Sequence, residues 1–350
     1  MKRKFTPLLI AGLLSLSLLA GCGKKEVETT TTEETVTTES AVEEDTEAAA
    51  TAADAEGTAA QDRAGNDIIL PAKVDKIVSM APSTTRFLID IGAADKIVAI
   101  DTNSYAYADQ LAADIPQFDM MAPDNEALVA LEPDIIFTSG MSNVGGEDAF
   151  KAARDAGICV FDIPSSPSLD DIANDMVAIG NAIGMEDETN KIVNEYNDKI
   201  AEIQEIAKNI TDKKKVLFEL SLPSSDYPSI YTFGKNTYLD EMITAIGAEN
   251  ITGDQESWIS ISEEEAIAMN PDVIVTNVNY IDDAVNVIKT APGWENVTAI
   301  QNGAVYYIDA DASNQPNQHV IDAMIQMAKQ IYPDEYAAFD DPFATSGDAE

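Results

Sequence analysis

Short apolar runs alternate with stretches of helical periodicity along the chain from residue 68 onward. Patterns of buried strands occur at 77–80, 96–100, 134–138 and 158–161, and helical patterns occur at 84–91, 125–131, 150–156 and 169–183. This alternation is typical of parallel sheets, because a connection between parallel strands usually contains a helix. The pattern therefore predicts an α/β fold with mainly parallel sheets.

One long helix is predicted over 186–209, where apolar side chains recur at helical spacing without glycine or proline. A second α/β segment follows, with strands at 216–220, 272–276 and 305–308 and helices at 238–246, 263–269 and 317–331. We therefore expect an N-terminal α/β lobe over 63–185, the inter-lobe helix over 186–209, and a C-terminal α/β lobe over 210–335.

The two α/β segments resemble each other in sequence. Residues 125–137 and 263–275 both carry a glutamate seven residues before a Pro-Asp pair that ends a helix and begins a strand. These glutamates are Glu126 and Glu264. Residues 87–97 and 242–251 form a second matching pair, in the same order. Two pairs in one order predict a duplication, with two similar lobes and a ligand cleft between them.

The N-terminus has the pattern of a lipoprotein signal peptide over 1–22. Three cations at residues 2–4 precede an apolar run over 5–19, and Leu-Ala-Gly-Cys follows at 19–22. The run is shorter than the roughly 20 residues that a membrane span needs. We therefore expect Cys22 to be acylated, so that the exported chain is anchored to the membrane by lipid alone.

Acidic segments are predicted at both ends of the exported chain. Residues 23–62 are rich in Thr, Glu and Ala with little aliphatic bulk, which predicts a disordered tether. Residues 336–350 are predicted to form an acidic tail. The formal net charge of −41 excludes nucleic acid as a partner, because such a surface repels phosphates. Cys159, the second of two cysteines, is expected to be a small buried strand residue.

The motifs of several other protein classes are missing from the sequence. No Gly-x-Gly-x-x-Gly follows a strand, and the Gly-Lys-Asn-Thr at 234–237 lacks the Walker spacing. A Ser-His-Asp triad would have to use His319, the single histidine, and a zinc carrier needs several. An enzyme is therefore not expected. A surface adhesin would share the lipid anchor, but it would not explain the paired Glu126 and Glu264 segments.

The chain resembles the periplasmic binding proteins for iron-siderophores, haem and vitamin B12. The resemblance lies in the lipobox, the tether, the paired Glu-x₆-Pro-Asp segments, the long helix, Lys-Ile-Val-Ser-Met-Ala-Pro-Ser-Thr at 76–84 and Gln-Asn-Gly-Ala-Val-Tyr-Tyr-Ile-Asp at 301–309. It implies a monomeric, extracytoplasmic capture protein without an intrinsic cofactor. It also implies that the partners are an ABC importer permease dimer and its ATPase, with Glu126 and Glu264 as the docking glutamates.

The same resemblance points to residues that contact the ligand. Trp258 matches a position where the vitamin B12-binding protein lines its cleft with tryptophan. Met121, next to Met120, matches the methionine that ligates iron in haem carriers. His319 begins a predicted helix, where a capping or solvated role is expected. Aromatic contacts are also expected from Tyr231 and Tyr105.

Few cations are available to bind an anionic ligand. Arg86, near the start of a predicted helix, and Lys235, in a glycine-containing loop, are the two candidates. Highly charged catecholates or citrates are therefore not favoured. An iron chelate, either a siderophore of low charge or haem, is the expected ligand, and a corrinoid is the alternative.

Overall fold

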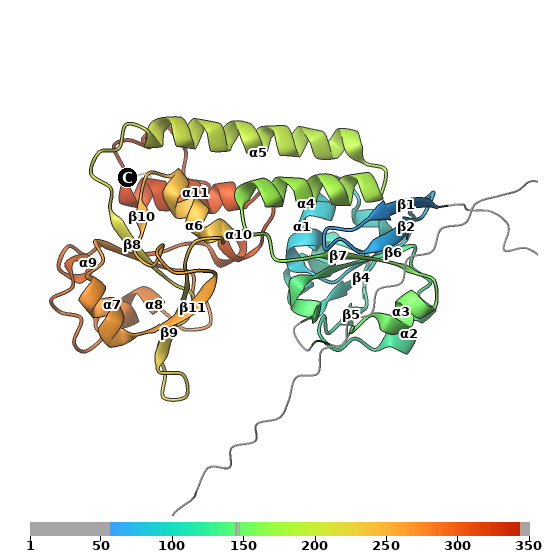
Figure 1. Ribbon diagram of the computed structural model, residues 1–350, viewed down its shortest axis with the longest axis horizontal. Helices are drawn as coiled ribbons and strands as arrows, with labels where there is room; N and C mark the ends of the chain where they lie inside the picture. The colour runs from blue at the N-terminus through green and yellow to red at the C-terminus, as the bar shows by residue number, and fades with distance from the viewer. Residues whose placement is uncertain (1–56, 144–145, 147, 344–350) are drawn as a thin grey trace, which may run out of the picture. The chain divides into compact units, whose positions relative to one another are not determined.

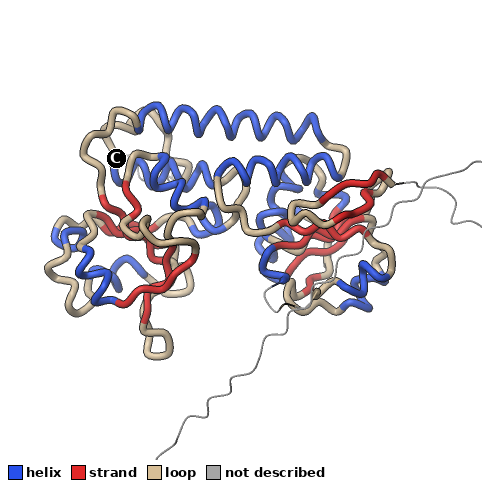
Figure 2. Tube along the Cα trace, in the orientation of Figure 1, coloured by secondary structure: helices blue, strands red, loops and turns tan. Residues whose placement is uncertain are grey.

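The computed structural model describes residues 57–143, 146 and 148–343, all within one structural unit. The predicted signal peptide, Cys22 and most of the predicted tether lie outside these residues. Two groups of strands, each flanked by helices, are visible in Figure 1 and Figure 2. We name them lobe 1 (57–168) and lobe 2 (210–343), and the helices between them the helical pair (169–209).

Lobe 1 is built on a parallel five-stranded sheet of order β5-β4-β3-β6-β7. Side chains alternate between its faces, so that Ile77 and Phe137 face α1 while Val78 and Ile136 face α2 and α3. The strands are β3 (Ile77–Ser79), β4 (Ile97–Asp101), β5 (Gln117–Phe118), β6 (Ile135–Ser139) and β7 (Cys159–Ile163). The helices are α1 (Pro82–Asp90), α2 (Asn125–Ala130) and α3 (Lys151–Asp155), with 3-10 turns at Ala94–Lys96, Thr102–Gln110 and Gly140–Asn143.

Lobe 2 repeats this plan with a parallel sheet of order β10-β8-β12-β13. Its strands are β8 (Lys215–Glu219), β10 (Glu249–Asn250), β12 (Val273–Thr276) and β13 (Val305–Tyr307). Its helices are α6 (Tyr238–Ala245), α7 (Glu263–Met269), α8 (Ala284–Lys289), α9 (Thr298–Gln301), α10 (Ala310–Asn314) and α11 (Val320–Ile331). An antiparallel pair, β9 (Ser229–Phe233) and β11 (Trp258–Ser262), is added beyond the end of β8.

Two antiparallel helices connect the lobes, α4 (Leu169–Ala182) and α5 (Glu186–Ala207). The long helix predicted from the sequence is α5. The start of α4 already lies beside lobe 2, where the Leu169 N–H donates to a Glu241 carboxylate oxygen at 2.7 Å. One hydrophobic cluster includes residues of both lobes and of both helices, among them Phe137, Met176, Ile203 and Phe218. The lobes therefore share part of their core.

The predicted duplication is present at the level of hydrogen bonds. In lobe 1, an Asp134 carboxylate oxygen accepts from the Lys76 N–H at 2.8 Å, and in lobe 2 Asp272 accepts from the Lys215 N–H at 3.0 Å. Each Pro-Asp pair thus ties the start of its own strand to the neighbouring strand. Gly92 and Gly247, which follow α1 and α6, have φ of 89° and 87°. Lys76 and Lys215 are therefore equivalent positions, and β3 corresponds to β8.

Two predicted boundaries are wrong. The tether was expected to reach residue 62, but β1 (Thr58–Gln61) pairs antiparallel with β2 (Asp67–Leu70). Asp62 is buried, and its carboxylate accepts a hydrogen bond from the Asp162 N–H at 3.1 Å. The acidic tail was expected from residue 336, but Tyr336 is fully buried and its hydroxyl donates to the Ile203 and Ile246 carbonyls. Neither contact was predicted, because the sequence around residues 58–62 is rich in alanine and the sequence after residue 336 is acidic.

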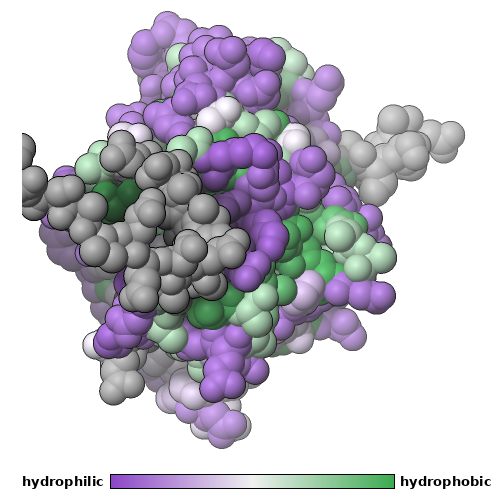
Figure 3. Space-filling model, turned by 90° about the vertical axis from the view of Figure 1, so that its right-hand side faces the viewer, coloured by the Kyte–Doolittle hydropathy of each residue, from purple (hydrophilic) through white to green (hydrophobic). Residues whose placement is uncertain are grey.

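The surface agrees with the acidic composition. Figure 3 shows the side of the molecule at the right of Figure 1, where the atoms not drawn in grey are mainly hydrophilic, with a smaller hydrophobic area among them. Within the described ranges, none of the helices combines the length and apolar character needed to cross a membrane.

Candidate functional site

A cavity of about 620 Å³ lies between the two lobes. Lobe 1 contributes the start of α1 and the segments that follow β6 and β7, and α4 contributes one wall. Lobe 2 contributes the start of α6, the start of β11 and the loop after α10. The carboxyl ends of parallel strands and a boundary between lobes are common positions for small-molecule sites. This cleft is the candidate ligand site.

Much of the cleft lining is apolar. Trp258 lines it from lobe 2 and is 38% exposed. The Trp258 ring stacks on Tyr231, with ring centroids 6.2 Å apart and planes 19° apart, and meets Phe233 edge-on at 6.3 Å. These contacts hold the indole in place, which is what a flat apolar ligand requires. The other large apolar lining residues are Phe87, Met120, Met141, Ile163, Met176, Ile179 and Tyr238.

The polar groups of the cleft are almost all neutral. Asp175 is buried and accepts from the Ser166 hydroxyl at 2.7 Å and from Arg63, which lies behind it. Burial raises the pKa of Asp175, while the bonds from Arg63 and Ser166 act against this rise. Asp311, at the lobe 2 wall, is exposed. Among the described residues that line the cleft there is no lysine, arginine or histidine.

The structure separates the two neighbouring methionines. Met120 lines the cleft and is 8% exposed, and its sulfur lies 3.9 Å from the Ser139 hydroxyl. Met121, the predicted haem-iron ligand, is 49% exposed and is not part of the cleft lining. Of the two predicted methionines, Met120 is therefore the one that lines the cleft, because the loop before α2 turns its first methionine inward.

The other predicted ligand residues lie outside the lining. Lys235 pairs with Glu256 at 2.9 Å, and Tyr105 is 70% exposed. Tyr231 reaches the cleft only through its stacking on Trp258. Arg86 pairs with Asp90 at 2.9 Å beside the cleft. The two predicted cations are thus both occupied by carboxylates.

Arg86 belongs to a polar cluster that joins the lobes, which we name the lobe clamp (Arg86, Asp90, His319 and Asp322). His319, at the start of α11, lies 2.9 Å from Asp90 of α1 through Nε2 and 2.7 Å from Asp322 through Nδ1. The bond to Asp322 and then the bond to Asp90 raise the pKa of His319 to about 9, although burial opposes them. His319 is therefore an imidazolium at neutral pH, and it donates to one carboxylate from each lobe.

Three further hydrogen bonds cross between the lobes near the clamp, and in one of them the Gln318 side chain donates to Asp90 Oδ2 at 2.5 Å. The Tyr107 hydroxyl donates to Gln315 Oε1 at 2.7 Å, and the Asn317 side chain donates to the Ser83 carbonyl at 3.2 Å. Ser83, Gln315 and Asn317 also line the cleft. The clamp and these bonds therefore fix one side of the cleft.

The predicted docking residues Glu126 and Glu264 lie away from the cleft. Each is exposed in the first turn of a short helix, α2 or α7, that is capped by Asp124 or Ser262. Figure 1 shows α2 and α7 on the side of their lobes opposite to α5. Neither carboxylate forms an ion pair with any residue in the described part of the chain, so both are available to a partner.

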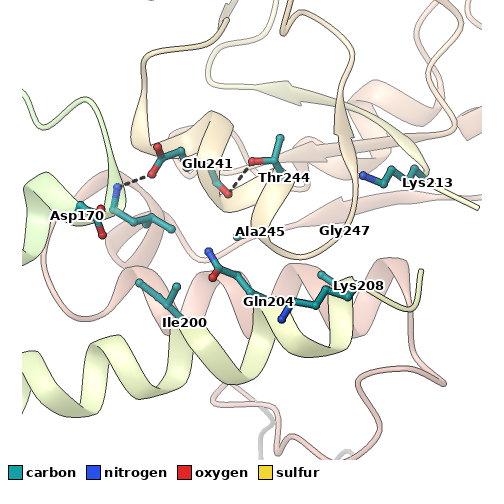
Figure 4. A pocket seen from close by; sticks show the side chains of 11 residues that line it. Asp170, Ile200, Gln204, Lys208, Lys213, Glu241, Thr244, Ala245 and Gly247 are labelled. Carbon is teal, nitrogen blue, oxygen red and sulfur yellow. Dashed lines mark hydrogen bonds between the residues drawn. The ribbon is translucent and has the colours of Figure 1, made fainter. Parts of the chain in front are cut away.

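A second cavity, of about 560 Å³, lies between α5 and α6 and shares no lining residue with the cleft. Figure 4 shows that the Glu241 carboxylate points to the Leu169 N–H, while Lys208 and Lys213 lie on the far side. The Glu241 carboxylate thus joins α6 to the start of α4. This cavity is open and polar, and it lacks the aromatic walls of the cleft.

The described residues contain no group of three or more His, Cys, Asp or Glu side chains arranged to hold a metal ion. Cys159 is half-buried at the start of β7, and burial raises the pKa of its thiol to about 11. The thiolate is therefore scarce at neutral pH.

The structure adds cleft residues that the sequence analysis missed. Asp175 interrupts the apolar face of α4 formed by Ile172, Met176 and Ile179, and a charged side chain on such a face is a detectable signal. Met141 and Asn317 lie in loops and carry no comparable signal. Their positions depend on how the lobes meet.

Comparisons with known proteins agree with this architecture. The family model described as periplasmic binding protein matches residues 77–312. An uncharacterized ABC transporter substrate-binding lipoprotein of Bacillus subtilis, YvrC, is 30% identical over 79% of this chain and 85% of its own length. A cobalamin-binding protein of Halobacterium salinarum is 26% identical over 77% of this chain and 73% of its own. The solved structure of a possible iron-binding, periplasmic solute-binding protein from Staphylococcus epidermidis has a TM-score of 0.65 at 26% identity, covering 74% of this chain and 99% of that one.

Proposed function

This chain belongs to the periplasmic binding protein family, and from that premise we propose that its cleft captures a corrinoid of the vitamin B12 type for import. The protein is a substrate-binding component of an ABC transporter and not an enzyme, so its partners include a permease and an ATPase. Cobalamin and iron both occur in the names of its relatives, so the expected iron chelate and the alternative corrinoid are both candidates.

The cleft lining is the observation that favours the corrinoid. A ferric catecholate or citrate carries negative charge, and haem carries two propionates, so each needs cations that are absent from the described lining. A corrinoid presents amide side chains around an apolar face. Neutral hydroxyl and amide groups such as Ser83, Asn103 and Asn279 suit those amides, and Trp258 suits the apolar face.

A calorimetric titration of the purified protein with cyanocobalamin, haem, a ferric hydroxamate and a ferric catecholate tests this proposal. We expect saturable binding of cyanocobalamin and weaker or no binding of the three iron compounds. Tight binding of a ferric chelate without binding of cyanocobalamin would refute the corrinoid assignment. The variants Trp258→Phe and Trp294→Phe form a matched pair, since Trp294 is buried outside the cleft and its change should leave corrinoid affinity unaltered.

Haem is the second candidate, because Met120 places a thioether in the cleft. A thioether can act as an axial ligand of haem iron. If haem binds, we expect its Soret band to change in Met120→Leu and to stay unchanged in Met121→Leu. A Soret band that stays as in the wild type in both variants would exclude methionine ligation by this loop.

We also infer how the protein is attached and where it docks. Acylation of Cys22 would hold it outside the cell by a lipid anchor, which is consistent with the name of the Bacillus subtilis relative. The exposed and unpaired carboxylates of Glu126 and Glu264 are suited to contact basic side chains of the permease, one from each lobe.

A further inference from the structure

A third cavity, of about 380 Å³, lies within lobe 2 and is separate from the cleft. It is enclosed by the end of β8, the start of α7 and the segment from α8 to Trp294, on the sheet face opposite to α5. Its apolar walls are Leu222, Pro223, Ile288, Ala291, Pro292 and Trp294. We name it the lobe 2 pocket.

Glu219 is a buried residue in the lining of this pocket. Glu219 is the last residue of β8, and alternation along the strand turns it to the same face as Leu217, toward α7 and α8. It is 2% exposed, and its Oε1 atom has no hydrogen-bond partner in the described part of the chain. A buried carboxyl without a partner costs several kcal/mol in general, so its presence calls for a physical reason.

The duplicated lobe provides an internal comparison. Because Lys76 and Lys215 are equivalent, Glu219 corresponds to Met80 of lobe 1. Met80 is fully buried in an apolar cluster with Val78 and Leu128. The fold therefore accommodates an apolar side chain at this position, and the carboxyl of Glu219 is not required by the architecture.

The other polar groups of the pocket are acidic or neutral. Glu263 lies at its rim, where one carboxylate oxygen accepts from Trp294 Nε1 at 3.2 Å, and Asn286 and Thr290 add neutral polar groups. Burial and then repulsion by Glu263 raise the pKa of Glu219 to about 8. Neither lysine nor arginine is present among the described residues that line the pocket.

We propose that the lobe 2 pocket binds the alkylammonium group of a small organic cation, with Glu219 as its counter-ion. An ammonium group would supply the charge and the hydrogen-bond donor that the Glu219 carboxyl lacks, and the apolar walls would cover an alkyl chain. A calcium ion needs six to eight oxygen ligands, more than two carboxyls provide, and an anion would be repelled by both of them. The lobe 2 pocket shares no lining residue with the cleft, so its binding does not depend on the ligand bound there.

Binding is coupled to a proton. At neutral pH Glu219 is mainly protonated, so the ammonium ion enters as the carboxyl releases its proton to solvent and an ion pair forms. As the pH increases toward about 8, the affinity for the ammonium ion should therefore rise by up to about tenfold for each pH unit and then level off. An alkylamine stays protonated throughout this range. A carboxyl with only a structural role would produce no such dependence.

The test uses the full-length protein with Trp258→Phe, which leaves Trp294 as its single tryptophan. Trp294 fluorescence is measured during titration with n-butylammonium at about pH 6 and about pH 8.5, with n-butanol as the uncharged control. We expect a saturable change with n-butylammonium that is at least tenfold tighter at the higher pH and is absent with n-butanol. An unchanged Trp294 fluorescence at all amine concentrations below those that unfold the protein would overturn the proposal, and so would an equal response to n-butanol.

Two further variants show whether Glu219 is the counter-ion. In the same background, Glu219→Gln keeps the shape and removes the charge, and Glu219→Met installs the residue of the equivalent lobe 1 position. Both should fold, as judged by circular dichroism, and both should lose the amine response. An unchanged, pH-dependent response in either folded variant would overturn the assignment of Glu219.

Discussion

The lobe clamp makes a quantitative prediction about stability. Replacing His319 by glutamine removes the imidazolium that donates to Asp90 of lobe 1 and to Asp322 of α11. The pKa of His319 rises from 6.5 to about 9 on folding. At about 1.4 kcal/mol for each pH unit, this rise corresponds to an upper limit of about 3 kcal/mol.

The measurable effect should be smaller than this limit. The His319 side chain is 31% exposed, so solvent screens part of the interaction. Arg86 Nε also lies 3.2 Å from His319 Nε2 and can donate to it once the ring is neutral. We therefore expect His319 to contribute about 1–2 kcal/mol to the free energy of unfolding.

The sign of the pH dependence follows from the direction of the shift. A group whose pKa is raised in the folded state adds its full stability below its unfolded pKa of 6.5 and loses it as the pH rises through about 9. Urea unfolding of the wild type and of His319→Gln at about pH 6 and about pH 10 measures this. We expect the wild type to be more stable than the variant by about 1–2 kcal/mol at the lower pH and nearly equal at the higher.

Comparing the two proteins at each pH removes the effect of other groups that titrate in this range. A difference between wild type and variant that stays constant with pH would refute the reasoning, since it would mean that His319 does not change its protonation between the two conditions. Asp322→Asn is the second variant, and it should lower the apparent pKa of His319 because the Asp322 bond is the largest cause of the rise.

Three further predictions concern the cleft, the docking residues and the two equivalent glycines. Trp258→Ala should weaken ligand binding about tenfold or more by removing the stacked wall, and an unchanged dissociation constant in calorimetry would contradict this. Reversing the charge of Glu126 and Glu264 to arginine should abolish uptake by cells while ligand affinity stays the same, and normal uptake would exclude the docking role. Gly247→Ala should destabilise more than Gly92→Ala in urea unfolding, by about 1 kcal/mol, because only at Gly247 does an added Cβ meet Ile210 Cδ1 at 2.8 Å. Equal losses would show that the positive φ alone sets both costs.

Much of the fold could be predicted because most helices and strands of each lobe have a recognisable pattern within a short segment of sequence. Apolar strands, the glycines after α1 and α6 and the two Pro-Asp pairs lie in short, self-contained segments. The antiparallel strands β9 and β11 were missed, since α6 and β10 lie between the two paired strands along the chain. The strand β1 was missed because its Thr-Ala-Ala-Gln sequence has the composition of the segment before it.

The candidate site was predictable only in part for a related reason. Trp258 was expected from its match to a cleft tryptophan of the vitamin B12-binding protein, and it lines the cleft from the start of β11. Arg86 and Lys235 were expected to face a ligand, but Arg86 pairs with Asp90 one helical turn along α1, and Lys235 pairs with Glu256, which only the folded chain brings near. Met120 and Met121 are adjacent in sequence, and the turn before α2 alone decides which of them points inward.

The attachment of β1 has a mechanical consequence. The described chain begins at the edge of lobe 1, where Asp62 bonds to the backbone of Asp162 and Arg63 pairs with Asp171 and Asp175 on α4. A force applied to the chain before residue 57 would therefore act on lobe 1 and on the first turns of α4. Lobe 2 would receive that force through α4 and α5, through the bond of Leu169 to Glu241, and through the lobe clamp that joins α1 to α11.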